Sequence, residues 1–249
     1  MLQTDMIKRF IPLLFIVVVA FYSCSDDEPQ NIVPETSLNT IMPLGASRVE
    51  GNRPNHESFR YELWKQLIDG DWEFDFIGTK MDPSTYPVHS GQDFDPDHEG
   101  RGGWTSGQIL AGIDGWLEEA GSPDIVLFSS PGGNDALQGM PYDQVVNNVN
   151  AIIDRIQDAN PNVTIIVEKL APGLSFFMTE QLLSYFNQMQ TDIEIIAADQ
   201  STSTSRVITV DMATGFMDSF LADPVHYNTV GAKFVADRYY DVLSDVMER

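Results

Sequence analysis

Short apolar runs alternate with amphipathic segments from residue 40 to the C-terminus. The apolar runs predict five strands, at residues 40–44, 72–77, 124–128, 163–167 and 207–211. The segments between and after them have the apolar spacing of helices, at residues 56–68, 107–120, 142–157, 176–190 and 229–247. Strands that alternate with helices form a mostly parallel sheet with helices on both faces. The sequence therefore predicts an α/β fold with a mostly parallel, five-stranded sheet.

Polar residues of chemical interest follow several of these strands. Connections between parallel strands are right-handed, so the carboxyl ends of the strands meet at one edge of the sheet. Ligands bind at that edge in open α/β sheets. Residues 79–104 are a polar stretch with three prolines and many glycines and aspartates, and we expect one long loop there, of the kind that usually carries function.

Ser47 follows the first predicted strand, directly after Gly45 and Ala46. Gly45 allows a sharp turn, which exposes the serine. A serine hydroxyl is a weak nucleophile unless a base takes its proton. His226 has the pKa range for that task, and Asp223, three residues earlier, is close enough to orient its ring. These residue types predict a nucleophile, a base and an orienting carboxylate.

Two further segments offer hydrogen-bond donors. Asn134 carries a side-chain amide, and Gly103 has a backbone N–H that no Cβ shields. With the N–H of Ser47 they would form a three-donor oxyanion hole, in which the loss of one donor costs about a hundredfold or more in rate. The other three histidines lie in polar stretches, and we expect them at the surface; they are His56, His89 and His98.

Together these segments resemble the four sequence blocks of the SGNH/GDSL hydrolase family. The resemblance runs from about residue 39 to the C-terminus and implies a flavodoxin-like, three-layer α/β/α sandwich. It also implies ester hydrolysis without cofactor or metal. By position, the catalytic residues would be Ser47, Asp223 and His226, and the oxyanion donors Ser47, Gly103 and Asn134. The family usually has an aspartate at the position of Ala46.

Two stretches, residues 41–45 with 59–64 and residues 97–105, are similar to acetylxylan-esterase-type carbohydrate esterases, which implies an O-acetylated carbohydrate as substrate. Trp104 would then stack on a sugar ring or pack beneath its loop, and the sequence leaves both open. Two alternative functions remain. One is a lipase or lysophospholipase-type esterase, and the other is a non-catalytic glycan-binding protein, which Ala46 favours.

Charge excludes one class of partner. The chain has a net charge of −23, and such a surface repels phosphate backbones, so we expect no nucleic-acid binding. Asp93, Asp95 and Asp97 alternate as in a calcium loop, but His98 and Trp104 stand where that loop needs glycine and glutamate. A solvated acidic loop is the favoured interpretation, with calcium as the alternative.

The N-terminus has the pattern of an export signal. Lys8 and Arg9 precede an uncharged run from Phe10 to Tyr22, which is shorter than the roughly 20 residues of a membrane span. Cys24, the single cysteine, follows this run, as the acylated cysteine of a bacterial lipoprotein does. We expect a signal at 1–23, a tether at 24–38 and the hydrolase domain at 39–249. The expected location is the membrane surface of a Gram-negative bacterium, with a lipid on Cys24 as the only membrane attachment; a periplasmic or secreted protein is the alternative.

Overall fold

A computed structural model describes residues 39–249, which lie within one compact unit. The predicted signal segment, Cys24 and the tether lie outside the described residues. Within 39–249, no helix combines the length and the apolar composition that crossing a bilayer requires.

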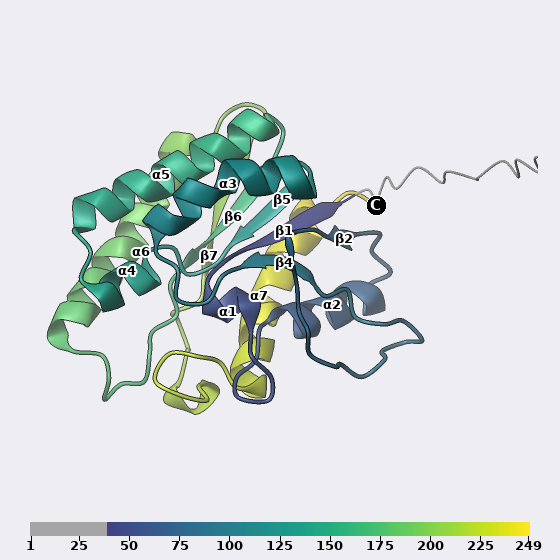
Figure 1. Cartoon of the computed structure of the whole chain (residues 1–249), viewed down its shortest axis with the longest axis horizontal. Coiled ribbons are helices and arrows are strands. Elements are labelled where there is room, and N and C mark those ends of the chain that lie inside the picture. The colour runs from purple at the N-terminus through teal and green to yellow at the C-terminus, as the bar shows by residue number, and fades with distance from the viewer. Residues whose placement is uncertain (1–38) are drawn as a thin grey trace, which may run out of the picture. The chain divides into compact units, whose positions relative to one another are not determined.

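One sheet of seven strands forms the centre of this unit (Figure 1). The strands are β1 (Thr40–Gly45), β2 (Asp75–Phe76), β3 (Lys80–Met81), β4 (Asp97–Gly100), β5 (Ile125–Phe128), β6 (Thr164–Lys169) and β7 (Arg206–Asp211). Their order is β3-β4-β1-β5-β6-β7, and β2 pairs with β1. Every pairing is parallel except that of β3 with β4. The predicted mostly parallel sheet is therefore confirmed.

Seven α-helices surround the sheet in the described part of the chain. They are α1 (Ser47–Glu50), α2 (Arg60–Asp69), α3 (Ser106–Ala120), α4 (Gly133–Gln138), α5 (Tyr142–Ala159), α6 (Glu180–Gln200) and α7 (Thr229–Val246), with a short 3₁₀ turn at Asp218–Phe220. Helices α3, α5 and α6 cover one face, and α2 and α7 cover the other (Figure 1). The result is the predicted three-layer α/β/α sandwich.

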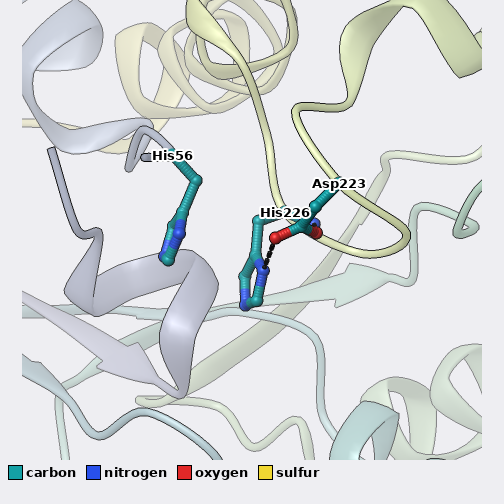
Figure 2. A group of neighbouring side chains, drawn as sticks. All are labelled: His56, Asp223 and His226. Atoms are coloured by element: carbon teal, nitrogen blue, oxygen red, sulfur yellow. Dashed lines mark hydrogen bonds and ion pairs between the residues drawn. The ribbon is translucent and has the colours of Figure 1, made fainter. Parts of the chain in front are cut away.

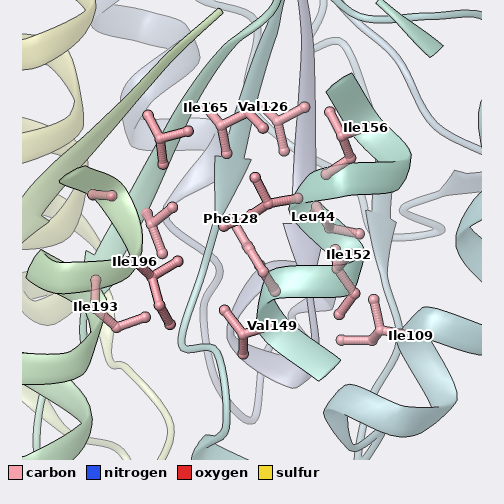
Figure 3. Packing of buried hydrophobic residues seen from close by; sticks show 14 of the residues in the cluster. Leu44, Ile109, Val126, Phe128, Val149, Ile152, Ile156, Ile165, Ile193 and Ile196 are labelled. Carbon is pink, nitrogen blue, oxygen red and sulfur yellow. The ribbon is translucent and has the colours of Figure 1, made fainter. Parts of the chain in front are cut away.

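Alternating side chains of the strands build a separate core on each face of the sheet. On β5, Val126 and Phe128 point toward α3, α5 and α6, whereas Ile125 and Leu127 point toward α2 and α7. The first core is drawn in Figure 3, where isoleucines and valines of the helices pack onto Phe128. This alternation follows from the two-residue period of a strand, and burial on both faces explains why the strands are continuous apolar runs.

The sheet has two strands more than the five predicted, because the stretch 79–104 is not one long loop. It contains β3 and β4, and β4 pairs with the C-terminal half of β1. The four residues of β4 include no large apolar side chain, so hydrophobic periodicity gives no signal. The buried Glu99 in β4 is balanced by an ion pair with Arg101 at 2.6 Å and by hydrogen bonds from Thr79.

Two helices have boundaries other than those predicted. Helix α2 begins at Arg60 rather than at residue 56, because residues 52–57 form a turn whose backbone pairs with Tyr227. Helix α6 begins at Glu180, where the Thr179 hydroxyl accepts a hydrogen bond from the N–H of Leu182, and it continues to residue 200. The remaining predicted helices and strands lie within a few residues of their positions.

Candidate active site

The carboxyl ends of β1, β4, β5 and β7 carry the predicted site residues to one edge of the sheet. Ser47 is the first residue of α1, directly after β1. Gly45 packs tightly at this turn, since a Cβ there would lie 2.9 Å from the carbonyl oxygen of Ser129. Only glycine fits this approach, and the turn it permits places Ser47 at the mouth of two pockets.

The predicted base and carboxylate meet Ser47 in one chain of hydrogen bonds. His226 Nε2 lies 2.8 Å from Ser47 Oγ, and His226 Nδ1 lies 2.7 Å from Asp223 Oδ2. Figure 2 shows the ring of His226 against Asp223. Because an ionised carboxylate only accepts, Nδ1 carries the proton and Nε2 is free to accept from the Ser47 hydroxyl. This tautomer is the one that general-base activation of a serine requires.

Backbone groups hold Asp223 in its ionised form. Partial burial raises the pKa of Asp223, but hydrogen bonds from the N–H groups of Val225 and His226 and from the His226 ring outweigh it, so the net pKa is below the ordinary value. The carboxylate therefore stays charged in weakly acidic solution, and it can compensate a positive charge that develops on His226.

The loop after β4 leaves one backbone N–H free at the site. Arg101 N–H donates to the Gly45 carbonyl, Gly102 N–H to Glu50 Oε2, and Trp104 N–H to the Arg101 carbonyl. Among the described residues, the N–H of Gly103 has no such partner, and Gly103 lines the groove that also contains Ser47. Gly103 has a φ of 77°, a conformation that glycine adopts without strain.

Asn134 lies in the first turn of α4 and lines both pockets beside Ser47. Its amide nitrogen donates one hydrogen bond, of 2.9 Å, to the Trp104 carbonyl. An amide NH2 has two hydrogens, so one remains for a ligand. The next residue, Asp135, is buried and accepts hydrogen bonds from the N–H and hydroxyl of Ser106, which fixes α4 against α3.

Ser47 borders two cavities that differ in size and polarity. The first is a pocket of about 40 Å³ with an apolar wall, and its lining includes Leu137, Leu170, Phe177, Met178 and Phe186. The second is an open groove of about 1120 Å³, lined on the other side of Ser47 by polar and charged side chains, among them Asn52, Arg53, Lys80 and Asp82. The first pocket is far smaller than the groove and therefore favours a small group.

Sequence reasoning missed two residues that hold these loops together. Arg48 donates to the carbonyls of Val225, Ala171 and Pro172, which joins the serine segment to the loop that carries His226. Glu50 accepts from Gly102, as described above. Neither has a sequence signature. The one indication in the sequence that they belong to the site is that both lie close to Ser47 in the chain.

Trp104 packs on Trp116, with ring centroids 5.5 Å apart, as a partly buried residue beside the core, and its stacking on a sugar ring stays a prediction. Other expectations from the sequence change with the structure. His98 is not at the surface but 2 % exposed. In the acidic stretch, Asp95 accepts from the backbone N–H groups of Phe76 and Asp97, and burial raises the pKa of Asp95 to about 6. Asp95 therefore faces the protein rather than solvent.

The predicted surface histidine His56 lies instead against the site, half-buried, with its ring stacked on that of His226 (Figure 2). Nitrogen or oxygen atoms of His56, Asp223 and His226 lie within 4.8 Å of one another. Lone pairs of imidazole lie in the ring plane, however, and two stacked rings direct them along parallel lines. Both nitrogens of His226 are also occupied, by Ser47 and Asp223. This arrangement does not converge on a metal ion.

Comparison with known proteins gives one family and several similar structures. Residues 84–234 match the GDSL-like Lipase/Acylhydrolase family. A carbohydrate esterase family 3 structure from Talaromyces cellulolyticus is 28% identical, with a TM-score of 0.73 over 84% of this chain and 97% of the other. A family 3 carbohydrate esterase from Clostridium thermocellum is 28% identical, with a TM-score of 0.67 over 84% and 99%.

A mutant acetyl esterase with an acetate ion is 27% identical to this chain, with a TM-score of 0.71 over 84% of this chain and 97% of the other. A search among curated proteins gave no match.

Proposed function

The chain belongs to the GDSL-like lipase/acylhydrolase family and is an esterase, and from this premise we propose that it removes short acyl groups, above all acetyl, from carbohydrate hydroxyls. The observation that carries the proposal is the position of Ser47 between a small apolar pocket and a wide, open groove whose lining includes many polar and charged residues. An acetyl methyl group suits the first, and a sugar chain suits the second. The carbohydrate and acetyl esterases among the similar structures support the same substrate class.

In the proposed reaction, Ser47 attacks the ester carbonyl while His226 Nε2 takes the hydroxyl proton. Asp223 stabilises the imidazolium that results. The negative charge on the carbonyl oxygen is held by the N–H groups of Ser47 and Gly103 and by the Asn134 amide. His226 then gives its proton to the departing sugar hydroxyl. Water, activated by the same ring, attacks the acyl-enzyme and releases the acid, which regenerates the Ser47 hydroxyl.

The principal experiment measures hydrolysis of p-nitrophenyl acetate and acetate release from acetylated xylan. We expect Ser47→Ala to lose at least about a thousandfold in kcat, as removal of a triad nucleophile does. The control is Ser244→Ala, a serine near the end of α7 whose hydroxyl donates to the Asp241 carbonyl. Equal rates for Ser47→Ala and the wild type would reject the mechanism.

Acyl-chain length distinguishes this proposal from a lipase. We expect kcat/KM to fall from acetyl to butyryl to octanoyl esters, because the pocket beside Ser47 has only about 40 Å³. Phe177→Ala enlarges that pocket and is expected to shift the preference toward butyryl. A wild-type enzyme that prefers octanoyl esters would instead support the lipase alternative. Glycan binding without acetate release would support the non-catalytic one.

The proposal for location is unchanged from the sequence: export, with a lipid on Cys24. Replacement of Cys24 by Ser in the full chain should release the protein from the membrane fraction. Metabolic labelling with a fatty-acid analogue measures the lipid directly. A labelled Cys24→Ser variant would contradict the proposal.

A further inference from the structure

We propose that His56 is a positioning residue, whose ring face holds the His226 imidazole in the plane that reaches both Ser47 and Asp223. The inference rests on the proposed function, because it concerns the group that acts as base there. It adds to the site a side chain beyond those of Ser47, Asp223, His226 and Asn134.

The two rings lie face to face. Their centroids are 4.0 Å apart, and their planes differ by 14° (Figure 2). His226 bonds Ser47 and Asp223 through its two ring nitrogens, whose hydrogen-bonding directions lie in the ring plane. Such bonds fix the position of the ring within that plane. They do not prevent the His226 ring from tilting out of that plane. The flat ring of His56 against one face of His226 blocks this tilt toward that side.

This contact acts on the serine in the first step of the reaction and persists after it. Once Ser47 is acylated, its oxygen no longer carries a proton to donate, and His226 Nε2 has to turn to a water molecule. At that stage the Asp223 bond, of 2.7 Å at Nδ1, is the remaining tie to the protein in the ring plane. The His56 face is unaffected by acylation, so it continues to restrain the ring while water is activated.

Backbone hydrogen bonds between two segments bring the rings of His56 and His226 together. The turn at residues 52–56 is closed by hydrogen bonds in both directions between Asn52 and His56, of 3.1 and 3.2 Å. Glu57, the next residue, donates its N–H to the carbonyl of Tyr227, at 2.9 Å. Tyr227 directly follows His226 in the chain. Hydrogen bonds between the backbones of these two segments therefore position the stacked rings, and the side chains do not meet independently of the backbone.

The surroundings of His56 indicate that its ring face, and not its nitrogens, serves the site. Nε2 is buried and has no hydrogen-bond partner among the described residues, an arrangement that is unfavourable for folding. Burial, followed by the nearby charge of His226, lowers the pKa of His56, and Asp223 opposes this only in part. The ring is thus neutral at neutral pH and adds no repulsion when His226 becomes positive.

Three substitutions separate the ring face from the nitrogens. His56→Phe keeps a flat face and removes the unpaired nitrogen, His56→Leu fills space without a flat face, and His56→Ala removes both. We measure kcat and KM on p-nitrophenyl acetate. We also measure the second-order rate at which a small alkyl fluorophosphonate modifies Ser47, because that rate reports the activation of the serine without use of the carbohydrate groove.

We expect His56→Ala and His56→Leu to lower both kcat and the modification rate about tenfold, with KM within about twofold. The reason is that a shift of a catalytic group by about 1 Å can lower the reaction rate about a hundredfold. His56→Phe should remain within about threefold of the wild type in both rates. It should also have a higher melting temperature, because it no longer buries an unpaired nitrogen. The control is His89→Ala, a histidine that bonds Asp69 at 2.7 Å and does not line either pocket.

Wild-type modification rates in both His56→Ala and His56→Leu would overturn the inference, and so would a His56→Phe variant as slow as His56→Ala. If the alanine variant does not fold, the leucine variant decides the outcome alone. The proposed function fails separately: it falls if Ser47→Ala is still modified by the fluorophosphonate at the wild-type rate, whatever the His56 variants do.

Discussion

At the scale of single residues, Asn134 is the donor whose contribution can be removed most cleanly. Its amide bonds the Trp104 carbonyl and has one hydrogen left for the site. We predict that Asn134→Ala lowers kcat on p-nitrophenyl acetate by about a hundredfold or more, the usual cost of one oxyanion donor. KM should change little, because the donor acts on charge that develops in the transition state.

Asn150→Ala on α5 is the matched control, since this asparagine bonds the carbonyl of Val146 and the side chain of Gln200 away from the site. Steady-state kinetics with both variants measures the difference. A loss confined to KM in Asn134→Ala would show that the amide binds substrate rather than the transition state.

At the scale of elements, the loop after β4 depends on α1 for its shape. Glu50 lies on α1, and its carboxylate accepts from the Gly102 N–H at 2.9 Å, beside the free N–H of Gly103. Ala46, also near Ser47, has no side-chain hydrogen-bonding group with which to share this task. Glu50 therefore supports the loop that carries one of the proposed oxyanion donors.

We predict that Glu50→Ala lowers kcat about tenfold, because the loop loses the acceptor that orients it. Glu50→Gln retains an acceptor oxygen and should recover most of this loss. Glu62→Ala on α2, which removes a partly buried ion pair with Lys65 at 3.0 Å, is the control. A glutamine variant as impaired as the alanine variant would mean that the charge, and not the hydrogen bond, is required.

At the scale of the whole molecule, buried His98 makes the fold sensitive to acid. Burial, reinforced by the nearby charge of Arg60, lowers the pKa of His98 to about 3 from an ordinary value of 6.5. Its Nδ1 accepts from the Gly100 N–H at 2.9 Å, and protonation would remove this acceptor. The unfolded chain therefore binds a proton on His98 below about pH 6.5, whereas the folded chain does so only below about pH 3.

The difference gives a direction for the pH dependence of stability. Where the unfolded state binds more protons, the free energy of unfolding falls as pH falls. We predict that the wild type loses stability relative to His98→Asn between about pH 6.5 and pH 3, because asparagine keeps an acceptor and does not titrate. Urea unfolding at several pH values measures the difference, with His89→Asn, at a partly exposed histidine, as the control. Parallel curves for the wild type and His98→Asn would contradict the prediction.

The sequence by itself determined the class of fold. Apolar runs of strand length separated by helical stretches predict a parallel sheet. Such runs can be recognised in the sequence because both faces of the sheet are buried. It also identified Ser47, Asp223 and His226 as residues for one site, because each follows a strand and parallel strands end at a common edge. The structure places His226 within hydrogen-bonding distance of both Ser47 and Asp223, in the predicted order.

Only the tertiary structure decided what surrounds them. Strand β4 has a polar sequence, and it forms because the edge of β1 offers unpaired backbone groups. The stack of His56 on His226 joins residues 170 positions apart in the chain, and the pocket beside Ser47 is walled by side chains from several elements. Local sequence carries periodicity and turn chemistry, but contacts between distant segments depend on how the layers pack, and no window of sequence contains them.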